Sequence, residues 1–205
     1  MSSDTSRAIL GAIIANNRKM QEKIILSTIS AWELGEKFET TRAQKNEALR
    51  EAKIAKQDGD LSENAPYQAA KEKFRTMGRI QRRLTREMDE LIKQGHTIID
   101  PLSWVRDEPV VVVELGTVAE IELSCEKQTV LIAGARDHHF PEEGEIIPIP
   151  YNSPLGKALL SHQIGDRFVA QINGNQCEIA ILRIRRPTRT EIINIFPALD
   201  DPATL

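Results

Sequence analysis

Apolar side chains in the first half of the chain recur at alternating spacings of three and four residues. This spacing places them along one side of a helix and is typical of the seam of a coiled coil. The first seam consists of Leu34, Phe38, Thr41, Lys45, Ala48, Ala52 and Ala55. The second seam consists of Tyr67, Ala70, Phe74, Met77, Gln81, Leu84, Met88 and Leu91. The pattern predicts two long helices that pair along this seam.

A short segment, residues 58–64, separates the two seams and predicts a tight turn. No Gly or Pro interrupts residues 37–57, so the first helix should run unbroken to the turn, which contains Gly59. The second helix is expected over residues 64–93, a length of roughly 45 Å at ~1.5 Å per residue. We therefore predict an antiparallel coiled-coil hairpin over residues 28–97, with its apex near Gly59.

Beyond residue 95 the pattern changes to short apolar runs bounded by turn residues, which are typical of strands. The predicted strands are residues 110–115, 118–123, 129–132, 145–148, 167–172 and 177–184. A short helix is predicted after Ser153, which can cap it, with Pro154 at the first helical position. Residues 98–186 are thus expected to form an α+β domain with a mainly antiparallel sheet and one short helix.

Two terminal segments complete the predicted organisation. The apolar residues of segment 1–27 suggest an amphipathic helical extension. We expect this extension to lie beyond the paired part of the hairpin, because the second helix ends too early to reach it. Residues 187–205 are expected to form an irregular tail.

The composition narrows the class of protein. Charged residues make up 28% and aromatic residues 4%, which fits a long solvated helical element with one modest core. The formal net charge of -3 provides no overall basic surface for nucleic acid, so any such contact has to be local. Cys125 and Cys177 lack metal-ligand spacing, and we expect two buried free thiols in a reducing cytoplasm. We expect neither a membrane span nor a secretory signal.

The predicted turn carries concentrated acidic chemistry. Asp60 and Glu63 are three residues apart, and Asp58 adds a third carboxylate. One interpretation is a helix capping box made by Asp60 and Glu63, with Ser62 or Asn64 as alternative caps. The other interpretation is functional: two or three carboxylates are too few to hold Mg²⁺ tightly, but they can complete a metal site in another protein. Spacing alone leaves both interpretations open.

Two motifs carry a family resemblance. The run GDLSENAPYQAAKE at residues 59–72 and the run NSPLGKALLSHQIGD at residues 152–166 resemble the bacterial transcript cleavage factors of the GreA/GreB family. The resemblance covers roughly residues 30–186. It implies an FKBP-like fold for the C-terminal domain. It also implies a transcription elongation factor in the bacterial cytoplasm, associated with the nucleoid through RNA polymerase.

The same resemblance implies roles for individual residues. The hairpin would enter the secondary channel of RNA polymerase, where Asp60 and Glu63 would help to hold the second catalytic Mg²⁺ and a water. The polymerase would then hydrolyse backtracked RNA near its 3′ end. The chain itself would be no enzyme, would bind no cofactor tightly alone and would have no small-molecule substrate. The residues expected to dock the C-terminal domain on RNA polymerase are Asn152, Ser153 and Pro154.

A row of basic residues follows the turn on the second helix. Its members on the side opposite the seam are Arg75, Arg79, Arg82, Arg83 and Arg86. An ordinary solvated face, interleaved with Glu72 and Glu87, is one interpretation. The other is a strip that contacts phosphates of the nascent RNA 3′ end. The residues best placed for that contact are Lys71, Arg75 and Tyr67.

Two further functions stay open at this stage. A regulator could occupy the polymerase channel and inhibit without promoting cleavage, and the extra carboxylate of Asp58 is the feature that favours it. A plain coiled-coil interaction module with a capped turn is the other. The run DLSEN, residues 60–64, favours cleavage.

Overall fold

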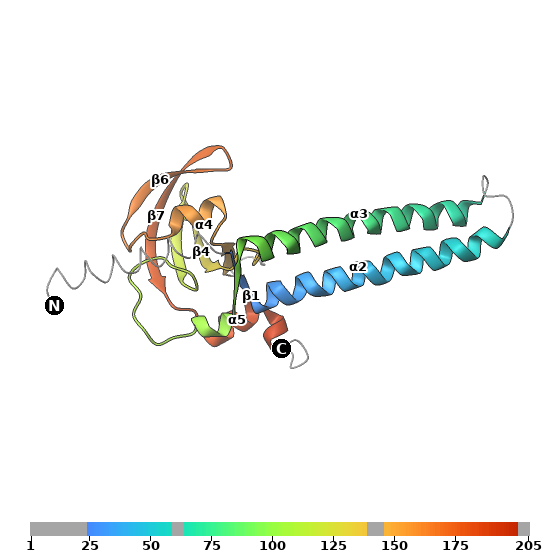
Figure 1. The fold of residues 1–205 in the computed structure, drawn as a ribbon. Coiled ribbons are helices and arrows are strands. Elements are labelled where there is room, and N and C mark those ends of the chain that lie inside the picture. The colour runs from blue at the N-terminus through green and yellow to red at the C-terminus, as the bar shows by residue number, and fades with distance from the viewer. Residues whose placement is uncertain (1–23, 59–63, 139–145, 201–205) are drawn as a thin grey trace. The chain divides into compact units, whose positions relative to one another are not determined.

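The computed structural model describes residues 24–58, 64–138 and 146–200 (Figure 1). Contacts divide the chain into two compact units. One unit is Trp32–Gly95, and the other combines Met1–Ala31 with His96–Leu205. In the described part of the chain, no helix is both long and apolar enough to span a membrane.

Two long helices form the first of these units. Helix α2 spans Thr28–Ala55 and continues as a 3-10 turn, Lys56–Asp58, while α3 spans Ala65–Gln94. Contacts between them run in opposite directions along the chain. Lys45 of α2 meets Gln81 of α3, and the later Glu51 meets the earlier Lys73. The predicted antiparallel hairpin and the predicted extent of its second helix are confirmed.

The predicted seam is confirmed as well, because every seam residue is buried or half-buried. The seam contains one polar layer. Lys45 Nζ donates a hydrogen bond to Gln81 Oε1 at 2.9 Å and lies 5.5 Å from the centroid of the Phe74 ring. Gly78 lies beside this layer, where an added Cβ would come within 3.9 Å of Lys45 Cε. A paired polar layer inside an apolar seam favours one register of the two helices over shifted ones.

The second unit is built on a five-stranded sheet with the order β5-β4-β3-β7-β6. Its strands are β3 (Val118–Leu123), β4 (Glu126–Ala133), β5 (Ile147–Pro150), β6 (Arg167–Ile172) and β7 (Asn175–Arg185). All neighbouring pairs are antiparallel except β4 and β5. A short helix, α4 (Pro154–Leu159), contacts β5 and β6. The predicted α+β class, with a mainly antiparallel sheet and one short helix, is confirmed.

Residues 110–115 do not form the strand that the sequence predicts. Val112 makes a single bridge to Gln163, and Val113 exchanges main-chain hydrogen bonds with the loop at Ser161 and His162. Val112 and Val113 are nevertheless fully buried. The apolar run therefore marks burial of an extended segment and not a sheet position.

The predicted N-terminal helix is wrong where the structure describes it. Ile24–Ser27 is a strand, β1, which pairs in parallel with β2 (His96–Ile99). Ile25 N donates to Tyr151 Oη at 3.1 Å, and Ile25 O accepts from Ala135 N at 2.7 Å. Consecutive apolar residues with two β-branched members favour a buried strand over an amphipathic helix. The rest of the predicted extension, residues 1–23, lies outside the described residues.

The predicted irregular tail is also wrong. Arg189–Ile195 forms helix α5, and Pro197–Asp200 forms a 3-10 turn. Ile192, Ile195, Phe196 and Leu199 are buried in the core of the sheet unit. The Phe196 ring meets the edge of Trp104, in the 3-10 turn Pro101–Trp104, at 6.3 Å between centroids. The tail thus completes the core around Trp104.

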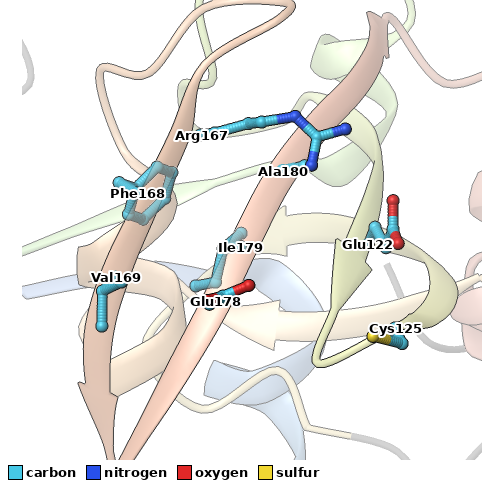
Figure 2. A pocket seen from close by; sticks show the side chains of 8 residues that line it. All are labelled: Glu122, Cys125, Arg167, Phe168, Val169, Glu178, Ile179 and Ala180. Atoms are coloured by element: carbon cyan, nitrogen blue, oxygen red, sulfur yellow. The ribbon is translucent and has the colours of Figure 1, made fainter.

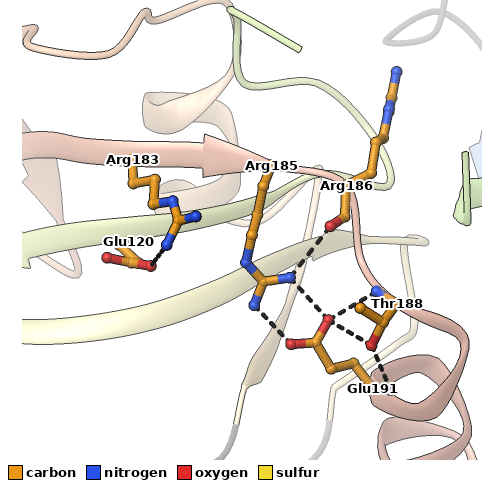
Figure 3. A network of polar contacts seen from close by, with 6 residues as sticks. All are labelled: Glu120, Arg183, Arg185, Arg186, Thr188 and Glu191. Carbon is orange, nitrogen blue, oxygen red and sulfur yellow. Dashed lines mark hydrogen bonds and ion pairs between the residues drawn. The ribbon is translucent and has the colours of Figure 1, made fainter. Parts of the chain in front are cut away.

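A salt bridge holds the start of α5 against the sheet (Figure 3). Glu191 accepts hydrogen bonds from Arg185 of β7 at 2.6 and 2.8 Å, one on each carboxylate oxygen. Glu191 also accepts from the N–H of Thr188, whose hydroxyl accepts in turn from Glu191 N. Pairing with Arg185, opposed by burial, and the Thr188 bonds lower the pKa of Glu191 from 4.5 to about 2.

A buried carboxylate fixes the start of α2 within the sheet unit. Asp137 Oδ1 accepts hydrogen bonds from the hydroxyls of Ser27, at 2.5 Å, and Ser30. Asp137 Oδ2 accepts from Gly134 N at 2.7 Å. A Cβ at Gly134 would lie 2.7 Å from that oxygen and 2.9 Å from Ser27 N, so only glycine fits there.

Both cysteines are free, but the prediction that they are buried is wrong: Cys125 is exposed and Cys177 is half-buried. Cys125 follows Ser124 in the two-residue turn between β3 and β4, where both residues have positive φ, 50° and 72°. That conformation is typical of a tight hairpin turn, whose side chains lie at the surface.

Candidate functional site at the hairpin turn

The ends of the two helices are tied together by one side chain at the turn. Asn64 is the N-cap of α3: its Oδ1 accepts a hydrogen bond from Tyr67 N at 2.9 Å. Its Nδ2 donates to Ala55 O, in the last turn of α2, at 2.6 Å. One amide therefore satisfies an unpaired group at the end of each helix. Pro66 lies in the first turn of α3, where its missing N–H costs no helical bond.

This cap decides one question that spacing left open. Because α3 begins at Ala65, Glu63 precedes the cap and is not the third residue of the helix. Asp60 and Glu63 therefore do not form the capping box of α3, and that interpretation is wrong. Asp60 and Glu63 themselves lie outside the described residues.

Small side chains line the seam next to the turn. Ala48 and Ala55 of α2 and Ala70 of α3 are all buried. Alanine at these positions lets two helices approach closely, so the hairpin is narrow near the turn. The expected decrease in seam size towards the turn thus has a visible structural result.

The RNA-contact candidates lie on the first turns of α3. Lys71 Nζ lies 5.7 Å from the centroid of the Tyr67 ring, which is cation–π distance. Arg75 pairs with Glu72 at 3.9 Å, and Arg79 pairs with the same carboxylate at 3.1 Å. All three of these paired side chains are more than half exposed, so the pairs contribute little stability and exchange readily.

The second motif of the sequence shapes the loop at α4. Ser153 Oγ accepts a hydrogen bond from Gly156 N at 3.0 Å and so caps α4, with Pro154 at its first position, as predicted. A Cβ at Gly156 would lie 2.2 Å from Pro150 O, so glycine is required there. Asn152 and Pro154 are exposed, whereas Ser153 is half-buried. The capping role of Ser153 leaves Asn152 and Pro154 as the accessible residues of the loop.

The end of the same motif makes a second turn. Asp166 Oδ2 accepts from Gln163 N at 2.8 Å and lies 3.0 Å from His162 Nδ1. These bonds, that from Gln163 first, lower the pKa of Asp166. The His162 ring stacks on Phe168 with 3.7 Å between centroids. The motif residues therefore have local structural duties that sequence reasoning had not assigned.

Metal ligands do not cluster elsewhere in the described part of the chain: no three His, Cys, Asp or Glu side chains there could hold an ion together. The described residues also revealed two features that sequence reasoning missed, the double role of Asn64 and the buried Asp137. An Asn directly before a helix was a signal for the first. The second had none, because Ser27 and Asp137 are far apart in the sequence.

Comparisons with known proteins identify the family. Residues 25–92 match the family described as "Transcription elongation factor, N-terminal", and residues 108–186 match "Transcription elongation factor, GreA/GreB, C-term". Transcription elongation factor GreA of Nitratiruptor sp. is 27% identical over 168 residues, which cover 80% of this chain and 94% of that protein. GreA of Bacillus cytotoxicus is 32% identical over 152 residues, which cover 73% and 87%.

A solved structure, the GreA factor homolog 1 (Gfh1) protein of Thermus thermophilus, is 21% identical and covers 80% of this chain and 99% of that one. Its TM-score of 0.32 is too low to support any argument. The two family matches and the 32% identity to a GreA along most of its length are sufficient. The chain belongs to the GreA/GreB family of transcription elongation factors.

Proposed function

We propose that this chain binds bacterial RNA polymerase and stimulates cleavage of backtracked RNA, with Asp60 and Glu63 as the acting residues. Membership of a family of elongation factors supports the partner. The capping of α3 by Asn64 supports the site, and it is the observation that carries this proposal. Since the helix does not need Asp60 or Glu63 for its cap, these acidic residues call for another role.

The shape of the hairpin supports entry into a channel. Helix α3 has 30 residues, which at ~1.5 Å per residue extend roughly 45 Å. The buried alanines near the turn keep that end narrow. A narrow rod of this length can carry two carboxylates into the secondary channel of the polymerase, beyond the reach of a surface loop.

We propose Mg²⁺ as the ion that Asp60 and Glu63 would hold, together with ligands of the polymerase. Carboxylate oxygens are ligands that Mg²⁺ prefers, and two of them are too few to hold it tightly without the polymerase. When bound, the ion would activate a water and stabilise the charge that develops on the phosphate. The two carboxylates would supply negative charge and orient the water, so the chain would act in trans and not as an enzyme by itself.

A backtracked elongation complex with 5′-labelled RNA tests this function. Asp60→Asn and Glu63→Gln keep hydrogen-bond acceptors but remove charge, so each should lower the cleavage rate by roughly tenfold or more. Binding to RNA polymerase should be unchanged. Asn64→Ala is the matched structural control, because it weakens the cap without touching either carboxylate. Cleavage at the parental rate by both charge variants would refute the assignment.

Inhibition without cleavage is the second candidate, and Asp58 favours it. This third carboxylate directly follows α2, at the end of the 3-10 turn. An inhibitor would slow nucleotide addition by the polymerase and leave backtracked RNA intact. The same complexes distinguish the two functions, since elongation rate and RNA cleavage are read separately. If Asp58→Asn turned an inactive protein into a cleaving one, the inhibitory function would be established.

We also propose that Lys71, Arg75 and the Tyr67 hydroxyl contact the RNA 3′ end. Support comes from the weak, exposed pairing of Arg75 and from the position of Lys71 over the Tyr67 ring. Lys71→Ala with Arg75→Ala should weaken binding to backtracked complexes more at low salt than at high salt. Arg42→Ala with Arg50→Ala removes the same charge from α2, where both residues form exposed pairs. Equal losses for the two double variants would argue against a specific RNA contact.

The loop before α4 is the proposed docking site on the polymerase. Asn152 and Pro154 are its exposed members. Asn152→Ala should raise the Kd for RNA polymerase while leaving the stability of the sheet unit unchanged, since the Asn152 side chain caps no helix. Ser153→Ala should lower stability as well, by about 0.5–2 kcal/mol, because it removes the cap of α4. An unchanged Kd for Asn152→Ala would remove this residue from the interface.

A further inference from the structure

The two edges of the five-stranded sheet are treated differently by the sequence. At the β5 edge, Tyr151 N donates to Ala133 O of β4 at 3.0 Å, so every second position back from Tyr151 faces β4. Pro148 and Pro150 occupy the positions that face away from the sheet. Proline has no N–H to offer an incoming strand, and natural proteins use it to protect sheet edges. The β5 edge is therefore closed to further pairing.

The β6 edge has no such protection. Its sequence, RFVAQI, contains neither Pro nor Gly, and β6 is the last strand of the order. Ile181 N donates to Asp166 O at 2.9 Å, so by alternation Phe168 faces β7 and Arg167, Val169 and Gln171 direct their main-chain groups outward. Those outward groups have no main-chain partner among the described residues.

The side chains along this edge are also unsatisfied. Val169 is 60% exposed although it is a large apolar residue. Figure 2 shows Arg167 extending over β7 next to Ala180, with Glu178 and Glu122 on the neighbouring strands. Among the described residues, none of these three charged side chains has a hydrogen-bond or ion-pair partner. They surround a cavity of about 300 Å³.

We propose that the open edge of β6 pairs with β6 of a second copy of this chain, antiparallel about a two-fold axis at Phe168. In this register Arg167 lies opposite Val169 of the second copy, and Val169 lies opposite its Arg167. The pairs exchange main-chain hydrogen bonds through the groups that face outward. The two Phe168 side chains face each other at a non-hydrogen-bonded position, where aromatic pairs are favourable.

The charges select this register over its neighbours. Glu178 is paired with Val169 across β7 and β6, so it lies two strand spacings, about 9.6 Å, from Arg167 of the second copy. Arginine and glutamate side chains together bridge that distance across the intervening valine. The exposed Arg167 side chain changes rotamer within nanoseconds, so it can turn outward at little cost. Centring the axis on Val169 instead would place Arg167 opposite Gln171, without a carboxylate.

Sedimentation equilibrium of the full chain over a range of concentrations tests this interface. Wild-type protein should dimerise weakly, and Arg167→Glu or Glu178→Arg should each raise the dimer Kd on the order of tenfold, because two symmetric pairs become repulsive. The double swap, Arg167→Glu with Glu178→Arg, should restore the Kd to within about threefold of wild type. Glu122→Arg makes the same charge change on the same face and should leave the Kd unchanged.

A backbone variant provides an independent check. Val169→Lys places a charge at the centre of the edge, as natural proteins do to prevent strand pairing, and should abolish the dimer. A chain that stays monomeric up to about millimolar concentration, or a double swap that fails to restore dimerisation, would overturn the proposal. Self-association that ignores all of these variants would place the contact on another surface. The proposed cleavage function does not use this edge, so its success or failure is separate.

Discussion

The salt bridge between Arg185 and Glu191 yields a quantitative prediction about the C-terminal helix. Glu191→Gln keeps the size of the side chain and an acceptor for the Thr188 N–H, but it removes the charge that Arg185 pairs with. The folded-state pKa of Glu191 is about 2, against an ordinary 4.5. A difference of about 2.5 units corresponds to roughly 3 kcal/mol at neutral pH. Since glutamine retains part of the cap, we expect a loss of about 2 kcal/mol.

The pH dependence follows from the direction of that shift. A carboxylate with a lowered folded-state pKa stabilises the fold above its unfolded pKa. Its contribution is lost as the pH falls from about 4.5 towards 2. The stability difference between wild type and Glu191→Gln should therefore be full at pH 7, about half at pH 3 and nearly absent at pH 2.

Urea unfolding monitored by Trp104 fluorescence measures this difference. Trp104 contacts Phe196, which directly follows α5, and a Trp32→Phe background removes the signal of the other unit. Glu120→Gln is a matched control: Glu120 pairs with Arg183 at 3.5 Å, but the two side chains are 40% and 63% exposed. That control should cost less than about 0.5 kcal/mol. A Glu191→Gln loss no larger than the control, or one that does not shrink below pH 4.5, would refute the reasoning.

Three further substitutions test the fold around the candidate site. Asn64→Ala should destabilise the hairpin by about 0.5–2 kcal/mol in circular dichroism melts, because both the α3 cap and the bond to Ala55 are lost. Gly116→Ala should destabilise the sheet unit by several kcal/mol in urea, since φ is +76° and the new Cβ would lie 2.4 Å from the Trp104 ring. Asp137→Ala leaves three buried donors without an acceptor and should cost about 3 kcal/mol or more, measured the same way. A neutral result at any of these positions would show that the local structure relaxes around the change.

The hairpin could be predicted from the sequence because its determinants are local and periodic. Seam residues from Leu34 to Leu91 repeat over many turns, and each repeat adds to the same signal. Residues 118–123 and 167–172 were predicted at the bounds of β3 and β6, since clear turn residues flank both. The acidic turn was also visible, but the choice of Asn64 as the cap needed the start of α3 to be known within one residue.

The errors come from residues whose neighbours are distant in the sequence. Ile24–Ser27 is a strand because its partners, His96–Ile99, arrive about seventy residues later, and no periodicity within residues 1–27 could report them. The tail became a helix because Trp104 and the sheet offer an apolar surface for Ile192 and Phe196 to cover. The run at residues 110–115 is as apolar as a strand, yet only its burial and not its pairing was encoded by that apolarity.

The early strand β1 makes the hairpin an insertion within the fold of the sheet unit. Ile25 and Ile29 belong to the core of that unit, and the Ser27 and Ser30 hydroxyls satisfy its buried Asp137. A fragment that begins after the hairpin, near residue 100, would lack these residues and leave Asp137 unpaired. To isolate the sheet unit, the segment Trp32–Gly95 has to be replaced by a short linker, with both flanks kept. During synthesis, the first residues of this core wait for more than a hundred others before their partners exist, which favours slow completion of the sheet unit.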